Sequence, residues 1–253
     1  MTESGWLAAL ASPSGAWALA LATTLLAILE SSRVRWAPFL ILYALILPLP
    51  AWFAGTAAFG PPAKAFAGHP VAIAALSLAI LAWEHGVFGL GYETWTRGKG
   101  ALRARFSPTA AMDALIAETA RRRGLAPGGV QAWAGVYFLV WAPLAEELFF
   151  WGFLYPLWRP VYGAPGAAAL VALWFAARHA AHFLFLPRPY PWPAALAFMA
   201  STGGAAIGNG WLLETGGSLW PLIALHFLSN LLSMALPKGP SPVGVSAPRR
   251  SPG

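Results

Sequence analysis

The sequence contains no cysteine and few charged residues. None of its 253 residues is Cys, and Asp, Glu, Lys and Arg together make up only 10% of them. The absence of cysteine excludes disulfide bonds, thiolate chemistry and metal sites with Cys ligands. A soluble domain carries about 25% charged residues, so the low charge excludes an ordinary soluble globular protein. In place of charge, the chain has hydrophobic side chains at 58% of its positions.

The hydrophobic residues gather in runs of roughly 20, a length that crosses a hydrocarbon core of ~30 Å as a helix. We therefore expect an all-α fold, a polytopic transmembrane helical bundle of about seven spans. The expected spans are 6–29, 36–55, 70–92, 130–158, 164–186, 192–213 and 217–236. Residues 1–236 would then form a single transmembrane domain, with a motif-bearing catalytic core at about 130–236. The Pro-, Gly- and Ser-rich residues 237–253 are expected to form a disordered tail.

The segment between the third and fourth expected spans is basic and differs from the rest of the chain. Within it, Ser107 and Pro108 are typical of a helix start, and Gly124 is typical of a helix end. Apolar residues on one face predict that 108–123 is an amphipathic helix lying on the membrane surface. An ordinary solvated linker helix would produce the same pattern.

The distribution of Lys and Arg predicts the orientation of the chain. With the N-terminus outside, thirteen of the sixteen Lys and Arg residues fall in cytoplasmic loops and the tail, as the positive-inside rule requires. We expect an integral membrane protein with its C-terminus in the cytoplasm, and the Ala-, Gly-, Pro- and Trp-rich composition favours a bacterial inner membrane. The net charge of +7 thus orients the chain in the lipid bilayer and does not indicate nucleic-acid binding.

Two adjacent carboxylates, Glu146 and Glu147, lie within the fourth apolar run. A carboxylate at membrane depth is costly unless it has a partner or lines a cavity, so the pair indicates a functional site. Successive residues of a helix point about 100° apart. We therefore expect one carboxylate to face the chemistry and the other to pair sideways. An ion cluster that packs helices, or a proton relay, would also explain the pair.

Two other expected spans carry polar residues at a matching depth. His179 lies in the fifth span, and His226 and Asn230 lie one helical turn apart in the seventh. Each would be explained alone by hydrogen bonds between helices, but together with Glu146 they indicate one water-containing cavity. There, a carboxylate can take a proton from water, and a His–Asn pair can donate to an oxyanion. Divalent metal binding is the alternative use of Glu and His, although the sequence has no HExxH motif. No serine has an obvious His or Lys partner.

At these residues the sequence resembles the CPBP family of intramembrane proteases, which includes the Ras-converting CAAX prenyl endopeptidases and the bacterial Abi proteins. The resemblance covers about 130–236. The family's motifs EExxxR, FxxxH and a His followed four residues later by Asn are matched, in this order, by Glu146 and Glu147, by Phe175 and His179, and by His226 and Asn230. Trp151 stands where the first motif has its arginine.

The resemblance implies a glutamate-dependent peptidase that forms no covalent intermediate and uses no metal or other cofactor. Glu146 would activate water, and His179 would hold that water or the glutamate. His226 and Asn230 would form the oxyanion hole, and Glu147 would support the site electrostatically.

The departure at Trp151 leaves Glu147 without the arginine expected one turn away. Either Glu147 is protonated or another cation pairs with it, and Arg178 is the candidate. Trp151 is also compatible with a non-catalytic Abi-type immunity or scaffold protein. A small transporter that uses Glu84 and His85 of the third span is a further alternative. We expect those two residues instead to lie near the membrane interface or to pack against the surface helix.

The resemblance implies a membrane-embedded or lipidated protein as the substrate. The eukaryotic branch of the family removes the last three residues of prenylated CAAX proteins. Other bacterial members, as in the myxosortase-like groups, process C-terminal anchor segments of surface proteins. Since the sequence demands no CAAX substrate, we expect a general endopeptidase for membrane peptides. None of these patterns indicates an oligomeric state.

Overall fold

The computed structural model of the chain describes residues 12–31, 66–90, 135–184 and 192–235, with the single positions 124, 126, 129 and 132. Every element within these residues is a helix, so the predicted all-α class is confirmed for this part of the chain. Three predicted features lie outside the described residues, namely the span at 36–55, the surface helix at 108–123 and the tail at 237–253.

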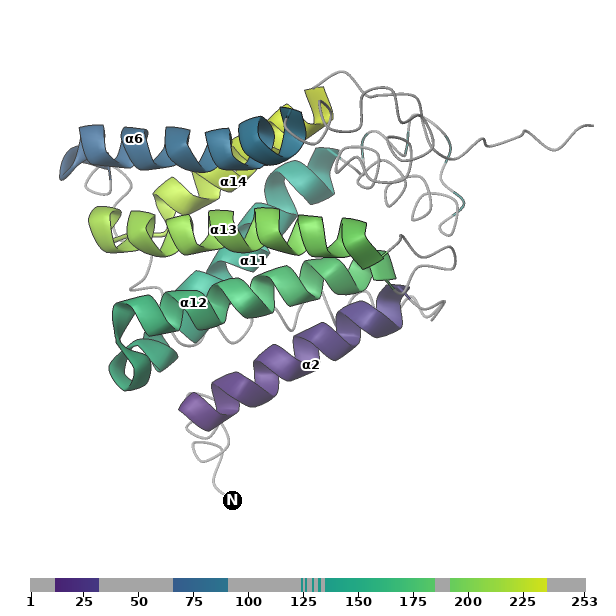
Figure 1. The fold of residues 1–253 in the computed structure, drawn as a ribbon, viewed down its shortest axis with the longest axis horizontal. Helices are drawn as coiled ribbons and strands as arrows, with labels where there is room; N and C mark the ends of the chain where they lie inside the picture. The colour runs from purple at the N-terminus through teal and green to yellow at the C-terminus, as the bar shows by residue number, and fades with distance from the viewer. Residues whose placement is uncertain are drawn as a thin grey trace, which may run out of the picture.

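The helices form a layered bundle. In chain order they are α2 (Pro13–Ser31), α6 (Pro70–Leu81), η2 (Ala82–Leu90), η3 (Gly135–Trp141), α11 (Ala142–Glu147), η4 (Leu148–Leu154), α12 (Tyr155–Leu184), α13 (Trp192–Gly216) and α14 (Trp220–Ala235), where η marks a π-helix. Helix α12 packs between α2 and α13, and α13 packs in turn against α6 and η2, as the row of helices in Figure 1 shows. Helix α14 packs on α11 and η3 and closes the bundle across the acidic segment.

The surface of the bundle suits a lipid environment. Two helical stretches are long and apolar enough to cross a membrane, Pro70–Val87 and Gly135–Ala181. Large apolar side chains point outward, with Val71 exposed by 82% and Leu78 by 67%, whereas several charged side chains are buried. Apolar groups outside and polar groups inside are expected where lipid replaces water. The described helices therefore fit a membrane protein, and the count of seven spans remains a prediction.

The chain turns at Gly163, where two helices join within the element α12. This glycine has a φ of 70° and a ψ of 171°, and Pro160 and Pro165 lie on either side of it. A φ of 70° lies in the left-handed region, which glycine adopts without steric cost, and each proline removes a helical N–H donor. The predicted break between the fourth and fifth spans is found at this position.

Two glycines of α13 allow α6 and η2 to approach closely. A Cβ on Gly204 would collide with the indole of Trp83, and a Cβ on Gly208 would lie 2.6 Å from Ile80 Cγ1. The Trp83 indole N–H donates to the Ser201 carbonyl at 3.0 Å. Small residues four positions apart are the usual way for membrane helices to pack tightly. This contact fixes η2, with its acidic residue, inside the bundle.

Candidate active site

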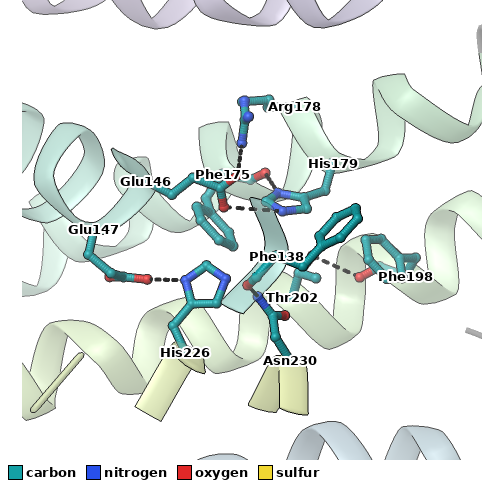
Figure 2. A network of polar contacts seen from close by, with 10 residues as sticks. All are labelled: Phe138, Glu146, Glu147, Phe175, Arg178, His179, Phe198, Thr202, His226 and Asn230. Atoms are coloured by element: carbon teal, nitrogen blue, oxygen red, sulfur yellow. Dashed lines mark hydrogen bonds and ion pairs between the residues drawn. The ribbon is translucent and has the colours of Figure 1, made fainter. Parts of the chain in front are cut away.

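The acidic pair ends α11, between the two π-helices η3 and η4. Glu146 is 6% exposed and Glu147 is fully buried. Figure 2 shows their carboxylates leaving the helix in different directions, with Glu146 bonded to a residue of α12 and Glu147 to a residue of α14. The expected separation of the two adjacent side chains is therefore confirmed.

Glu146 is held by two basic side chains of α12. Its Oε1 accepts a hydrogen bond of 2.7 Å from Arg178 Nη1, and its Oε2 lies 3.5 Å from His179 Nε2. The side chain of Arg178 is only 2% exposed. A buried charge requires a countercharge and hydrogen bonds, and the guanidinium supplies both. The ion pair thus favours the ionised, basic form of Glu146.

The backbone fixes the orientation of the His179 ring. Its Nδ1 lies 2.8 Å from the carbonyl oxygen of Phe175, one helical turn earlier. Because a carbonyl only accepts, Nδ1 carries the hydrogen, and the neutral ring then presents the lone pair of Nε2. This lone pair is on the side of Glu146 Oε2 (Figure 2). Two hydrogen-bond acceptors from different helices therefore face one another.

Glu147 binds His226 of α14. The distance from His226 Nδ1 to Glu147 Oε1 is 2.7 Å, and the imidazole donates this bond because an ionised carboxylate only accepts. The other ring nitrogen, Nε2, is on the side away from Glu147 in Figure 2. A carboxylate on one nitrogen of an imidazole favours the protonated ring, and only the protonated ring carries a hydrogen on its other nitrogen as well. His226 is thus suited to donate from Nε2 to a group in the site.

Asn230 binds the backbone of η3. Its Nδ2 donates to the Phe138 carbonyl at 2.7 Å. In a π-helix that carbonyl would accept from the N–H five residues later, but residue 143 is proline and has no N–H. Asn230 thus binds the Phe138 carbonyl across the helix interface, at a position where Pro143 supplies no N–H. One of the two amide hydrogens of Asn230 is used in this bond, and the other is available to a ligand.

Trp151 and Arg178 differ from the expected arrangement. The Trp151 ring is buried and packs against Tyr155, with ring centroids 5.6 Å apart. It also lies where a Cβ on Gly210 would be 3.2 Å away, so it contacts α13. Arg178 was expected to pair with Glu147, but it binds Glu146. The expectation is wrong because Glu147 points to α14, where His226 is its partner.

The structure brings the predicted residues together. Glu146, Glu147, His179, His226 and Asn230 converge from α11, α12 and α14 in the network of Figure 2. Phe175 lies among them, with its ring 4.3 Å from the His179 ring and 6.3 Å from the His226 ring. Phe175 of the FxxxH motif therefore acts in two ways. Its carbonyl orients His179, and its ring lies between the two histidine rings.

A second polar cluster was not expected at this place. Ser229 Oγ donates to Glu84 Oε2 at 2.6 Å and lies 3.1 Å from His85 Nε2. The side chains of Glu84 and His85 contact α14 beside the candidate site, and the surface helix against which they were expected to pack lies outside the described residues. Ser229 was expected to have no histidine partner, and it has one. Only the pairing of helices reveals this, since the cluster joins residues about 145 positions apart in the chain.

The donor set offers little to a metal ion. Within the described residues, no three His, Asp or Glu side chains converge as a metal site requires. Each carboxylate of the candidate site instead has a hydrogen-bonded cation or imidazole as its neighbour.

Comparison with known proteins gives a family match for part of the chain. Residues 128–232 match the family model described as type II CAAX prenyl endopeptidase, Rce1-like. Searches of curated proteins and of solved structures gave no significant match. The matched residues include all three motifs and every residue of the network in Figure 2. Over residues 128–232, this helical chain is similar to the Rce1-like type II CAAX prenyl endopeptidases, which is consistent with a CPBP family intramembrane protease.

Proposed function

We propose that this chain is an intramembrane endopeptidase that hydrolyses a peptide bond of a membrane-embedded or lipidated protein, with Glu146 activating the water. The supporting observation is the distance of 3.5 Å between Glu146 Oε2 and His179 Nε2, two acceptors in a buried site. A water that donates one hydrogen to each acceptor is held with an oxygen lone pair available for attack. Glu146 is the base because it can take a full proton from that water.

The charges around Glu146 suit this role. Arg178 binds Oε1 and supplies a positive charge beside the carboxylate, while Oε2 is left for the water. His179 cannot turn away from the water because the Phe175 carbonyl holds its Nδ1. Glu146 and His179 are thus held in place before the substrate binds. This reduces the entropic part of the activation barrier for hydrolysis.

The oxyanion is stabilised from α14. Water attack on the scissile carbonyl places a negative charge on its oxygen, and His226 Nε2 and the second amide hydrogen of Asn230 donate to it. Removing one such donor typically costs about 10²–10³ in kcat. When the tetrahedral intermediate collapses, Glu146 gives the proton that it took to the leaving nitrogen. The products are a carboxylic acid and an amine, and no cofactor is consumed.

The substrate class follows from the membrane setting and the matched family. Type II CAAX prenyl endopeptidases are named for prenylated proteins, which supports a lipid-anchored C-terminal segment as the substrate. Such a segment would enter between helices whose outer surfaces are apolar. Cleavage inside the membrane would separate the anchor from the rest of the protein.

The experiment compares membrane proteins of cells that carry the wild type, Glu146→Gln or Glu214→Gln by mass spectrometry. Gln at position 146 keeps the acceptor for Arg178 but cannot accept a proton from water. Glu214→Gln is the matched control, because it makes the same change at a partly exposed carboxylate outside the network. We expect specific C-terminal fragments to disappear with Glu146→Gln and to remain with the control. Identical fragments in all three strains would refute the proposal.

A non-catalytic scaffold is the competing function, and Trp151 is the observation that favours it. Its ring contacts α13 and gives the acidic pair no charge, unlike the arginine of the motif. For a scaffold, Glu146→Gln would keep the cellular phenotype as long as the protein folds. Loss of the phenotype with normal protein levels would favour the peptidase.

A further inference from the structure

The polar contact between η2 and α14 depends on one serine. Ser229 Oγ donates to Glu84 Oε2 at 2.6 Å, and His85 Nε2 lies 3.1 Å from the same oxygen. The hydroxyl has one hydrogen, which the carboxylate accepts, so the imidazole donates to the hydroxyl oxygen. A serine nucleophile would need the reverse direction, with the imidazole accepting from the hydroxyl. Two neighbouring side chains of η2 thus hold one hydroxyl of α14.

Ser229 shares one turn of α14 with the two proposed oxyanion donors. It lies three residues after His226 and directly before Asn230. His226 binds Glu147 on α11, and Asn230 binds the Phe138 carbonyl on η3 (Figure 2). Because successive residues of a helix point about 100° apart, Ser229 lies about 60° from His226 and about 100° from Asn230 around the axis. This turn of α14 is therefore bound to three elements at three places on its circumference.

The part of α14 that carries these residues is not packed into the core. The buried residues of the helix all come before His226, and they are Pro221, Leu222, Ile223 and Leu225. None of the described residues 226–235 is buried, and Phe227 and Leu228 are 40% and 39% exposed. Lipid is as apolar as these side chains, so burying them in it does not favour one rotation of the helix. Hydrogen bonds are thus the contacts that fix the rotation of this part of α14.

The other side of the contact is anchored on α13. Trp83 directly precedes Glu84, and its indole N–H donates to the Ser201 carbonyl at 3.0 Å. Its ring lies so close to Gly204 that a Cβ there would collide with it. Helix η2 thus binds α13 through Trp83 and α14 through the next two residues. The hydroxyl of α14 is therefore held by an element that is itself fixed in the bundle.

A small rotation of α14 would displace both oxyanion donors. Side chains of a helix end about 5–6 Å from its axis, so a rotation of about 10° moves them by about 1 Å. A misplacement of about 1 Å in a catalytic site can lower the rate about 100-fold. The rotation of this turn is therefore a property on which the oxyanion hole depends.

We propose that Ser229 is a positioning residue that fixes the rotation of α14 and so places the two oxyanion donors, His226 and Asn230. Glu84 and His85 are the groups of η2 that hold it. The catalytic consequence rests on the proposed function. The placement of Asn230 against η3 does not, and it can be measured in the resting protein.

The experiment measures the contact between Asn230 and Phe138 by solid-state NMR of the full-length protein in lipid bilayers. The chain has only two asparagines, Asn209 and Asn230, so ¹⁵N-labelled Asn gives two side-chain amide signals, and Asn209→Gln assigns them. With ¹³C in the carbonyl groups of Phe, the dipolar coupling between Asn230 Nδ2 and the Phe138 carbonyl carbon reports the hydrogen bond. Phe138→Leu removes this label and gives the background. We expect a coupling above this background in the wild type.

The serine provides a matched pair of variants. Ser229→Thr keeps the hydroxyl, and Ser229→Val has nearly the shape of Thr without it. We expect the coupling to persist in the Thr variant and to fall toward the background in the Val variant. Ser233→Val makes a comparable change one turn further along α14 and should leave the coupling unchanged. The same coupling in the wild type and Ser229→Val would overturn the proposal.

A second pair of variants tests the contact from η2, and it decides the question if Ser229→Val does not fold. Glu84→Gln keeps an oxygen that accepts from Ser229, whereas Glu84→Leu has none. We expect the coupling of Asn230 to persist in the Gln variant and to be lost in the Leu variant. An unchanged coupling in Glu84→Leu would also overturn the proposal.

Cleavage assays separate this proposal from the proposed function. If the wild type cleaves, we expect Ser229→Val to lower kcat roughly tenfold with little change in KM, as for lost transition-state stabilisation. If no cleavage is found but Ser229→Val loses the coupling, the proposed function fails and this inference stands. If Glu146→Gln abolishes cleavage but Ser229→Val keeps the coupling, the inference alone fails.

Discussion

Arg178 supplies a positive charge next to Glu146 inside the bundle. The side chains are 2% and 8% exposed, so neither is solvated by water. Breaking a buried ion pair by removing one partner costs about 3–5 kcal/mol, because the other charge is left uncompensated. Removing both charges costs much less.

We therefore expect Arg178→Gln to unfold at a lower temperature than the wild type in detergent. The double variant Arg178→Gln/Glu146→Gln should regain most of the lost stability, although it should remain inactive. Thermal unfolding followed by circular dichroism measures both effects. If the double variant melts no higher than Arg178→Gln, the pair does not stabilise the fold in this way.

Some residue-level features could be predicted from sequence and others could not. The divergence of Glu146 and Glu147 follows from helix geometry alone, and the depth of His179, His226 and Asn230 follows from counting along each span. The partner of Arg178 could not be predicted, because it depends on how α12 is rotated toward α11. Sequence gives the order of residues around one helix but not the rotation of that helix relative to its neighbours.

At the scale of elements, Pro143 explains the contact between α14 and η3. Pro143 has no N–H to give to the Phe138 carbonyl five residues earlier, and Asn230 donates to that carbonyl at 2.7 Å. Proline thus removes one helical N–H donor at the place where another helix binds. The π-helical stretches on both sides of α11 are rare structures that occur frequently at functional sites.

Pro143→Ala should restore an N–H to the helix and compete with Asn230 for the Phe138 carbonyl. We expect cleavage to slow by about tenfold or more, in the range for a misplaced oxyanion donor, while the melting temperature stays equal or rises. Parallel measurements of cleavage and thermal unfolding test this. Unchanged cleavage in a folded Pro143→Ala variant would show that the proline does not position Asn230.

The glycines of α13 position η2. A Cβ at residue 208 would lie 2.6 Å from Ile80, whereas a Cβ at residue 203 would make an ordinary contact of 3.5 Å with Ala176. We expect Gly208→Ala to lower stability by about 1–3 kcal/mol through overpacking, and Gly203→Ala to be close to neutral. Unfolding measurements distinguish them. Similar stabilities for the two variants would contradict the close packing of α6 on α13.

Among the elements, the break at Gly163 could be predicted from the sequence, because proline and glycine impose their backbone conformations locally. The π-helices could not, since the wider turn depends on tertiary contacts as well as on local preference. The cluster of Glu84, His85 and Ser229 was also missed, because apolar periodicity does not reveal which faces of α14 and η2 meet.

At the scale of the whole molecule, an exposed polar contact closes one end of the bundle. Arg159 donates to both carboxylate oxygens of Glu214 at 2.9 Å, and the Tyr155 hydroxyl donates to Oε1 at 2.7 Å. Glu214 follows the predicted sixth span. The hydrogen bonds from Arg159 lower the pKa of Glu214 below its usual range. This contact joins the region of the turn at Gly163 to the end of α13.

The stability from this contact should therefore depend on pH. A carboxyl with a lowered folded pKa contributes stability above its unfolded pKa, and the contribution is lost as pH falls through the folded value. We expect the melting temperature of the wild type to fall more steeply below about pH 4.5 than that of Glu214→Gln. The effect should be small, since both side chains are partly exposed. Parallel melting curves for the two proteins would contradict it.

The class of the whole molecule was predictable from composition, because few charges and long apolar runs suit only a helical membrane protein. The motif spacing also predicted the family that residues 128–232 match. How the helices pack around the acidic pair was not predictable, since apolar surfaces of similar composition allow many packings in a membrane.

The partners of the acidic pair have a consequence for biogenesis. In chain order the two carboxylates come first, and their partners Arg178 and His226 follow 32 and 79 residues after Glu146 and Glu147. During synthesis, α11 thus emerges from the ribosome before either countercharge exists. Unpaired carboxylates make insertion into a bilayer unfavourable. We expect this segment to leave the insertion machinery late, together with α12 and α14, so that the site assembles in the same step as the C-terminal half of the bundle.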